Sequence, residues 1–321
     1  MDFELSEDEV ALQDGVRKLC EGRFTMERVR ATESTGGVDR EGWRDLADAG
    51  VFALRVPEGD GGVGLGMKEA VLVFEELGRA LVPGPLVGSH LAAATVDGAA
   101  DGSTIVGAVE AGDEPLLVEN RDALDVLLLV RDDGAFALDP GALDVEPVAR
   151  PLDPLTPLHR VTGDVAQGEQ VAGPDVVARW RLEGAALVAA LQLGIAEATT
   201  DLAVAYAKER QQFDKPIGSF QAVKHMCADM LVRTEVARAA VYAAGVTLDD
   251  PDVGDPERAV HAAKVNAGEA AVRNGKACIQ VHGGMGFTWE VDAHLYLKRA
   301  WLLDTVLGSV AEHAEAIATA L

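Results

Sequence analysis

Apolar residues recur every three or four positions near the start of the chain, which is the spacing of one helix face. This stripe consists of Val10, Leu12, Val16 and Leu19. Ser6 and Glu9 precede the stripe as a capping box, so they predict the start of a helix. Helical spacing returns over residues 67–81 and stops at Val82-Pro83-Gly84-Pro85, because proline cannot continue a helix. We therefore expect residues 1–98 to form a helical domain.

The pattern changes between residues 99 and 175, where the apolar residues come in short runs typical of strands. These runs cover residues 116–118, 126–130, 136–138 and 145–148. Asp132-Asp133-Gly134 has the composition of a hairpin turn between the second and third runs. The segment predicts a small antiparallel β-domain.

Residues 176–321 return to helical patterning. We expect helices over residues 183–210, 219–248, 256–281, 290–307 and 309–320. Asp255 with Pro256 supplies an N-cap and a first helical position for the third of them. The chain is thus mainly α with a small β-domain.

Composition excludes several classes of function. The formal net charge of −25 argues against binding nucleic acid or an anionic membrane, because both require a basic surface. Cys20, Cys227 and Cys278 lie far apart without metal-ligand spacing, so we expect buried reduced thiols and no metal site. No stretch looks apolar enough to span a membrane, and the acidic start is unlike a signal peptide. We expect a soluble cytoplasmic protein.

The stretch from Tyr206 to Met230, YAKERQQFDKPIGSFQAVKHMCADM, holds the main candidate chemistry. Pro216 and Gly218 break the helical pattern, which places Arg210 at one helix end and Gln221 near the start of the next. A guanidinium fixed at a helix end can bind a phosphate through paired hydrogen bonds. On spacing alone, the better explanation is that Arg210 caps its own helix and Gln221 is solvated.

Three separate sequence motifs resemble those of the acyl-CoA dehydrogenase family, and they occur along the chain in the family's order. Arg-x-x-Phe, a short turn and Phe-Gln-x-x-x-His, starting at Arg210, is similar to the family's flavin-binding signature. Gln280-Val281-His282-Gly283-Gly284 resembles a second family word. The third is the opening MDFELSEDEVALQDGVRKL, followed by GVFALRVPEGDGGVGLG and VFEELGRALVPGP. The glycines of GDGGVGLG alone predict a turn and not a dinucleotide site, since no βαβ pattern surrounds them.

The resemblance implies a fold and a reaction. The fold is an N-terminal helical domain, here residues 1–98, a middle β-domain over 99–175 that is shortened in this chain, and a C-terminal four-helix bundle over 176–321. Family members remove a proton from the α-carbon of an acyl-CoA substrate and pass hydride from the β-carbon to FAD, which is reoxidised by an electron-transfer flavoprotein. Such chemistry requires a carboxylate base on the side of the substrate opposite the flavin.

The catalytic base is the part of the family pattern that this chain lacks. Aligning Tyr296-Leu297-Lys298 through Gly308-Ser309 with the family's base-bearing word puts Leu307 at the base position, and leucine cannot accept a proton. Another group of the family carries the base about seven turns before the arginine, a count that reaches Gly184. Its neighbour Glu183 is a weak candidate, and a solvated or helix-start acid is the alternative. Glu290 and Asp304 are weaker still.

The flavin-binding pattern is also incomplete. The family's word for the isoalloxazine, Thr-Glu-Pro-x-x-Gly-Ser-Asp, does not occur in residues 116–173. The words that hold the ADP end of a neighbouring subunit's flavin are present, and they imply cofactor-binding roles for Arg210, Gln212, Phe213, Gln221, Gln280, Val281, His282, Gly283 and Gly284. An ordinary helix stop is the alternative interpretation of Gly283-Gly284. Asp214 stands where the family usually has glycine, which puts the turn geometry in doubt.

Both gaps fit one interpretation. The chain resembles the shorter subunit of actinobacterial heteromeric acyl-CoA dehydrogenases, several of which act on CoA thioesters of sterol side chains. This implies an α₂β₂ heterotetramer with a longer subunit that supplies the base. Two alternatives stay open: a self-sufficient homo-oligomer that uses Glu183 as base, and a non-catalytic scaffold subunit that binds CoA thioester or flavin.

Overall fold

The computed structural model describes residues 5–34, 36–112 and 114–320. The described chain forms two compact units, each assembled from several stretches. The helical unit combines the chain up to Cys20 with Val71–Leu81 and everything from Ala185 onward. The β-containing unit combines Glu21–Ala70 with Val82–Gly184. Because these units are defined by packing, they do not test the predicted domain boundaries at residues 98 and 175, which stay predictions.

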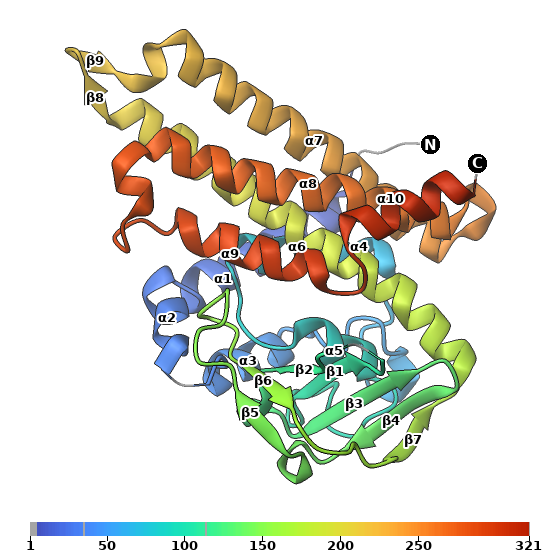
Figure 1. The fold of residues 1–321 in the computed structure, drawn as a ribbon. Coiled ribbons are helices and arrows are strands. Elements are labelled where there is room, and N and C mark those ends of the chain that lie inside the picture. The colour runs from blue at the N-terminus through green and yellow to red at the C-terminus, as the bar shows by residue number, and fades with distance from the viewer. Residues whose placement is uncertain (1–4, 35, 113, 321) are drawn as a thin grey trace. The chain divides into compact units, whose positions relative to one another are not determined.

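Two sheets form the middle of the β-containing unit (Figure 1). The first has the strand order β1-β3-β4-β7, and the second has the order β2-β6-β5. The strands are β1 (Val106–Glu110), β2 (Leu117–Glu119), β3 (Val126–Arg131), β4 (Gly134–Leu138), β5 (Val145–Pro147), β6 (Leu158–Val161) and β7 (Glu169–Ala172). The predicted hairpin is confirmed, because β3 and β4 pair antiparallel up to Arg131 opposite Gly134.

The prediction of a wholly antiparallel domain is wrong in one respect. β1 pairs with β3 in parallel, from Val106 opposite Val126 onward, so the first sheet is mixed. Strands β1, β6 and β7 also lie outside the predicted runs. β7 reads Glu-Gln-Val-Ala and β6 carries His159 and Arg160, so neither is a continuous apolar run. Their strand conformation depends on pairing with β4, β2 and β5 and not on their own sequence.

Helices also occur in the β-containing unit, and they form most of the helical unit (Figure 1). Their bounds are α1 (Glu7–Arg23), α2 (Met26–Ala31), α3 (Arg40–Asp48), α4 (Met67–Arg79), α5 (Leu86–Ala92), α6 (Pro174–Glu209), α7 (Gln221–Asp249), α8 (Pro256–His282), α9 (Ala293–Thr305) and α10 (Val310–Thr319). Two predicted helix starts are confirmed. Ser6 Oγ accepts the Glu9 N–H at 3.3 Å while Glu9 accepts the Ser6 N–H at 2.7 Å. The Asp255 side chain accepts the Arg258 N–H at 3.2 Å.

Helix α6 differs most from its prediction. It begins at Pro174, nine residues before the predicted start at Glu183, and it is 36 residues long. By length and composition α6 could cross a bilayer, which corrects the expectation that no stretch is apolar enough. However, 78% of its most apolar window is buried inside the protein. Its apolar residues therefore form core, and Gly194 shows why small residues are needed: a Cβ there would lie 1.9 Å from the Glu75 carbonyl oxygen of α4.

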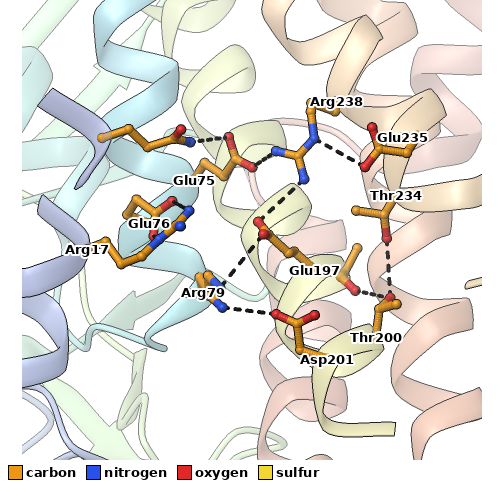
Figure 2. A network of polar contacts seen from close by, with 12 residues as sticks. Arg17, Glu75, Glu76, Arg79, Glu197, Thr200, Asp201, Thr234, Glu235 and Arg238 are labelled. Atoms are coloured by element: carbon orange, nitrogen blue, oxygen red, sulfur yellow. Dashed lines mark hydrogen bonds and ion pairs between the residues drawn. The ribbon is translucent and has the colours of Figure 1, made fainter. Parts of the chain in front are cut away.

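A network of charged side chains ties α1, α4, α6 and α7 together in the helical unit (Figure 2). Arg17 donates to Glu76 at 2.6 Å, and Arg79 donates to Asp201 at 2.9 Å. Arg238 of α7 forms an ion pair with Glu75, which also accepts the Tyr242 hydroxyl at 2.8 Å. Glu75 is fully buried, and burial raises the pKa of its carboxyl to about 7 although the Arg238 charge opposes the shift. The network therefore links four helices through charged side chains, which are costly to bury unless they are paired.

Candidate functional site

The predicted flavin word forms a short hairpin between α6 and α7. Strands β8 (Gln211–Gln212) and β9 (Lys215–Pro216) pair antiparallel, with Phe213 and Asp214 as the loop. Both loop residues have positive φ, 55° and 60°, as a two-residue hairpin of the primed type requires. The turn therefore forms although Asp214 stands where the family usually has glycine. Aspartate tolerates a positive φ better than most residues do.

Close packing holds this hairpin against the end of α6. The Arg210 N–H donates to the Tyr206 carbonyl at 2.9 Å, and the Ile217 N–H donates to the Arg210 carbonyl at 2.8 Å. A Cβ on Gly218 would lie 2.8 Å from the Ala207 carbonyl oxygen, so glycine permits this approach. Phe220, the N-cap of α7, packs edge-on to Phe213 at 6.1 Å. The Arg210 backbone is thus fixed while its side chain is exposed.

The second flavin word lies where α8 ends and a 3-10 turn, η7 (Gly283–Phe287), begins. Gly283 has φ 59° and ψ −135°, a conformation that requires glycine. Gly286 is also needed by the chain, since a Cβ there would lie 2.5 Å from the Ile279 carbonyl oxygen. Gly284 differs from both, because its φ is not positive and an added Cβ would meet no atom within 4 Å. Packing among the described residues therefore does not explain glycine at 284.

A small apolar core brings these two words to one end of the helical unit. It is formed by buried residues of α6, α7, α8 and α9, namely Ala203, Ala207, Met230, Cys278, Val281 and Ala293. Ile217 and Val223, on either side of the start of α7, pack against it. Figure 1 shows the β8–β9 hairpin and the turn between α8 and α9 at the same end of this bundle.

The outward-facing groups at this end match an anionic, aromatic ligand. Arg210 and Gln280 are exposed and form no side-chain hydrogen bond or ion pair with other described residues. Helix α7 starts without a side-chain cap, which leaves its first N–H groups available to an anion. Phe213 and Phe287 are 86% and 85% exposed. The diphosphate and adenine of FAD fit this set of groups, which offers a cation, an amide, an uncapped helix start and an open glycine surface.

The other predicted cofactor residues have varied surroundings. Gln212 Nε2 donates to the Gln211 carbonyl at 2.9 Å, and Gln221, the first residue of α7, is exposed with its amide 3.5 Å from His225. Val281 and His282 are buried, at 7% and 8% exposure, so a ligand could reach their backbone more readily than their side chains. His282 instead stacks on Tyr206, at 4.2 Å between ring centroids. Their roles toward a cofactor stay predictions.

Glu183 is neither solvated nor at a helix start, which corrects both parts of that alternative. It is 3% exposed and lies inside α6. Arg55 donates to both of its oxygens, at 2.8 and 2.5 Å, and Arg179 donates at 2.5 Å. Burial alone would raise the pKa of the Glu183 carboxyl, but the hydrogen bonds and charges of Arg55 and Arg179 outweigh burial and lower it. Such a carboxylate is a poor general base.

We expect Glu183→Gln to lower the thermal stability of the protein and to leave the turnover of an active assembly within about twofold of wild type. The amide cannot accept from two guanidiniums as a carboxylate does, so buried donors lose part of their pairing. Steady-state kinetics with the assembled enzyme provides the measurement. A fall of roughly a hundredfold or more, the scale of a lost general base, would assign the proton transfer to Glu183.

Comparison with known proteins finds two family models that match this chain. Residues 6–101 match the acyl-CoA dehydrogenase N-terminal domain, and residues 176–321 match the C-terminal domain. The acyl-CoA dehydrogenase IpdE2 of Mycolicibacterium smegmatis is 35% identical over 316 residues, covering 95% of this chain and 96% of that protein. This chain belongs to the acyl-CoA dehydrogenase family.

Further relatives differ from one another in length and assembly. The acyl-CoA dehydrogenase FadE34 of Mycobacterium tuberculosis is 38% identical over 84% of this chain, but the match covers only 41% of FadE34. Among solved structures, the ChsE4-ChsE5 complex from M. tuberculosis has a TM-score of 0.84 at 25% identity, covering 99% of this chain and 98% of the compared chain. The Tcur3481-Tcur3483 steroid ACAD variant has a TM-score of 0.83 at 24% identity, covering 98% and 97%. The predicted fold class is confirmed.

Within this acyl-CoA dehydrogenase fold, Leu307 lies in the turn between α9 and α10. Its φ is 53°, and its carbonyl accepts from His313 Nε2 at 2.9 Å. The fully buried Lys264 donates to the Val306 and Leu303 carbonyls, at 2.9 and 3.2 Å, and so caps the end of α9. Of the two weaker acids, Asp304 accepts the Val310 N–H at 3.2 Å and Glu290 is exposed before α9 starts. Asp304 is thus engaged at the start of α10 and Glu290 faces solvent, so their geometry does not mark either as a base.

Proposed function

We propose that this chain is one subunit of a heteromeric, FAD-dependent acyl-CoA dehydrogenase that desaturates an acyl-CoA thioester between its α- and β-carbons. In this proposal the chain supplies the ADP-end half of an FAD site that it shares with a longer partner subunit, in an α₂β₂ assembly. The observation that carries the proposal is the outward-facing set of Arg210, Gln280 and the open surface at Gly284. These groups face away from their own chain and have no partner among the described residues.

Each group has a distinct role toward the partner's cofactor. Arg210 binds the diphosphate through its guanidinium, and Gln280 supplies a neutral donor. The backbone at Gly283 and Gly284 allows close approach, because no side chain covers it. Phe213 at the hairpin tip offers an exposed ring to the adenine. When bound, FAD accepts the hydride from the substrate, and an electron-transfer flavoprotein reoxidises it.

The proposal assigns the base to the partner. In this chain, Leu307 occupies the position at which the family resemblance puts that carboxylate, and Glu183 is held by two arginines. The relatives' names and lengths support a two-chain assembly. ChsE4-ChsE5 is a complex, and more than half of FadE34 lies outside the part that matches this chain, which leaves room for a second subunit in one polypeptide.

For the substrate we propose a bulky steroid CoA ester, by similarity to the steroid ACAD among the solved structures. The acyl group is bound at the interface of the two chains, which is why the chain needs its partner for turnover. Assaying steroid and straight-chain acyl-CoA esters with the assembled enzyme tests this class. A preference for the straight-chain ester would refute the substrate assignment without affecting the shared FAD site.

Expression of the chain alone and with a longer acyl-CoA dehydrogenase chain encoded beside it tests the proposal as a whole. We expect a colourless product alone and a yellow, active complex on co-expression, because each FAD site needs residues of both chains. A yellow, active protein from this chain alone would instead favour the homo-oligomer. A yellow complex without turnover toward any acyl-CoA would favour the scaffold subunit.

A further inference from the structure

We infer that the stacked rings of Tyr206 and His282 position the two halves of the FAD site relative to each other. The inference rests on the proposed function, since one half is Arg210 with its hairpin and the other is Gln280 to Gly284. Tyr206 and His282 are positioning residues in this account. They set where the ligand-binding groups lie and do not touch the ligand themselves.

The stack joins the last turns of two helices. Tyr206 lies one turn before Arg210 at the end of α6, and His282 is the last residue of α8, directly before Gly283. The ring centroids are 4.2 Å apart, and the ring planes differ by 24°. Because His282 is 8% exposed, the contact is shielded from water. Stacked planar rings fix both the separation and the relative orientation of the elements that carry them.

Hydrogen bonds hold the His282 ring in place on α8. Its Nδ1 lies 2.8 Å from the Cys278 carbonyl, one turn earlier in the helix. A carbonyl can only accept, so Nδ1 carries the proton and the tautomer is determined. The Gly283 N–H donates to the Gln280 carbonyl, so the start of the glycine turn is bonded to the residue that carries the neutral donor. A shift of the His282 ring would therefore shift the turn at Gly283.

Backbone contacts carry the position of Tyr206 to the other half. The Tyr206 carbonyl accepts the Arg210 N–H, and the Arg210 carbonyl accepts the N–H of Ile217, which directly follows the returning strand of the hairpin. The surrounding core contains alanines at 203, 207 and 293 together with Met230, Cys278 and Val281. The alanines have no side-chain torsion with which to orient one helix end against the other. The stack adds a contact between two planar rings, which fixes orientation as well as distance.

Three variants in the co-expressed complex test the inference. We expect His282→Ala to weaken FAD retention roughly two- to tenfold, the range of one aromatic pair. Tyr206→Phe keeps both the stack and the hydrogen bond of His282 to the Cys278 carbonyl, so it should retain FAD like wild type. His282→Phe keeps the stacked rings without that hydrogen bond, so it should recover most of the FAD retention that His282→Ala loses. Bound FAD per complex is measured after desalting and dilution, at a temperature well below the unfolding transition. Rescue by His282→Phe distinguishes positioning from direct binding by the imidazole nitrogens.

A second readout does not depend on flavin. Hydrogen exchange at the Ile217 amide of the complex should accelerate in His282→Ala, because the hairpin loses its contact with the end of α8. If His282→Ala does not fold, the same measurement is made on Tyr206→Leu. Unchanged exchange together with unchanged FAD retention in a folded variant would overturn the inference. Arg210→Ala is the reference variant. If Arg210→Ala loses FAD and a folded His282→Ala does not, the positioning role is rejected and the shared site stands. If both variants retain FAD, the shared site itself is rejected.

Discussion

Arg238→Leu should destabilise the protein by about 3–5 kcal/mol at pH 8, the cost of leaving a buried carboxylate without its ionic partner. Glu75 is fully buried and its ion pair with Arg238 joins α4 to α7 (Figure 2). Tyr242 and Gln13 donate to Glu75 at 2.8 and 3.2 Å and remain in the variant, but neither carries a charge. Urea unfolding of the purified protein followed by circular dichroism measures the effect.

The cost should be smaller at pH 6. Burial raises the pKa of Glu75 to about 7 from an ordinary value of 4.5, so the folded protein binds this proton more tightly than the unfolded chain. That contribution to stability is complete below pH 4.5 and is lost as the pH rises through 7. Removing Arg238 removes the charge that opposes the shift, so in the variant the carboxyl is neutral at pH 6 and needs no ionic partner.

The double variant Glu75→Leu with Arg238→Leu provides the control. Replacing both partners by apolar residues is often close to neutral, because the desolvation cost of the pair disappears with its attraction. We expect the double variant to be more stable than Arg238→Leu and to lose the pH dependence between 6 and 8. An Arg238→Leu protein that unfolds at the same urea concentration as wild type at pH 8 would show that the pair contributes nothing.

Gly284→Val should weaken FAD retention in the assembled complex roughly ten- to a hundredfold, at least as much as loss of a charge-assisted hydrogen bond. A branched side chain would cover backbone that a diphosphate must approach closely. The chain itself should tolerate the change, since a Cβ at 284 meets no atom within 4 Å. FAD per complex after desalting, with the unfolding temperature of the same sample, gives both values.

Gly286→Ala is the matched control two residues away. Its Cβ would lie 2.5 Å from the Ile279 carbonyl oxygen, so the change should cost about 1–3 kcal/mol of stability through overpacking. The two glycines thus predict opposite outcomes: lost flavin with intact stability at 284, and lost stability at 286. If Gly284→Val instead lowers stability and leaves flavin binding intact, the turn is an ordinary helix stop.

Local signals in the sequence predicted much of the fold. Capping at Ser6 and Asp255 and the hairpin at Asp132-Asp133 depend on neighbours in sequence, and the structure confirms them. The parallel pairing of β1 with β3 depends on residues about 20 positions apart, and the polar strand β7 needs β4 beside it. Such elements owe their conformation to tertiary pairing, which the local pattern does not contain.

The candidate site divides in the same way. Arg210, Gln280, Gly283 and Gly284 could be chosen because their words resemble family signatures, and the structure exposes all four. The environment of Glu183 could not be predicted, because Arg55 is 128 residues away along the chain. The stack of Tyr206 on His282 was equally hidden. A lone tyrosine and a lone histidine carry no signal of contact until α6 and α8 are placed.

The central claim is that Arg210 holds the flavin of a partner subunit, and mixing experiments test it most directly. Wild-type longer subunit is assembled with wild-type or Arg210→Ala chain, and FAD per complex is measured after desalting. Removing one charge-assisted contact should weaken FAD retention roughly ten- to a hundredfold while the complex stays assembled, with a smaller loss in Gln280→Ala because its hydrogen bond is neutral. Unchanged flavin content in an intact Arg210→Ala complex would mean that Arg210 only caps its own helix, and would contradict the account.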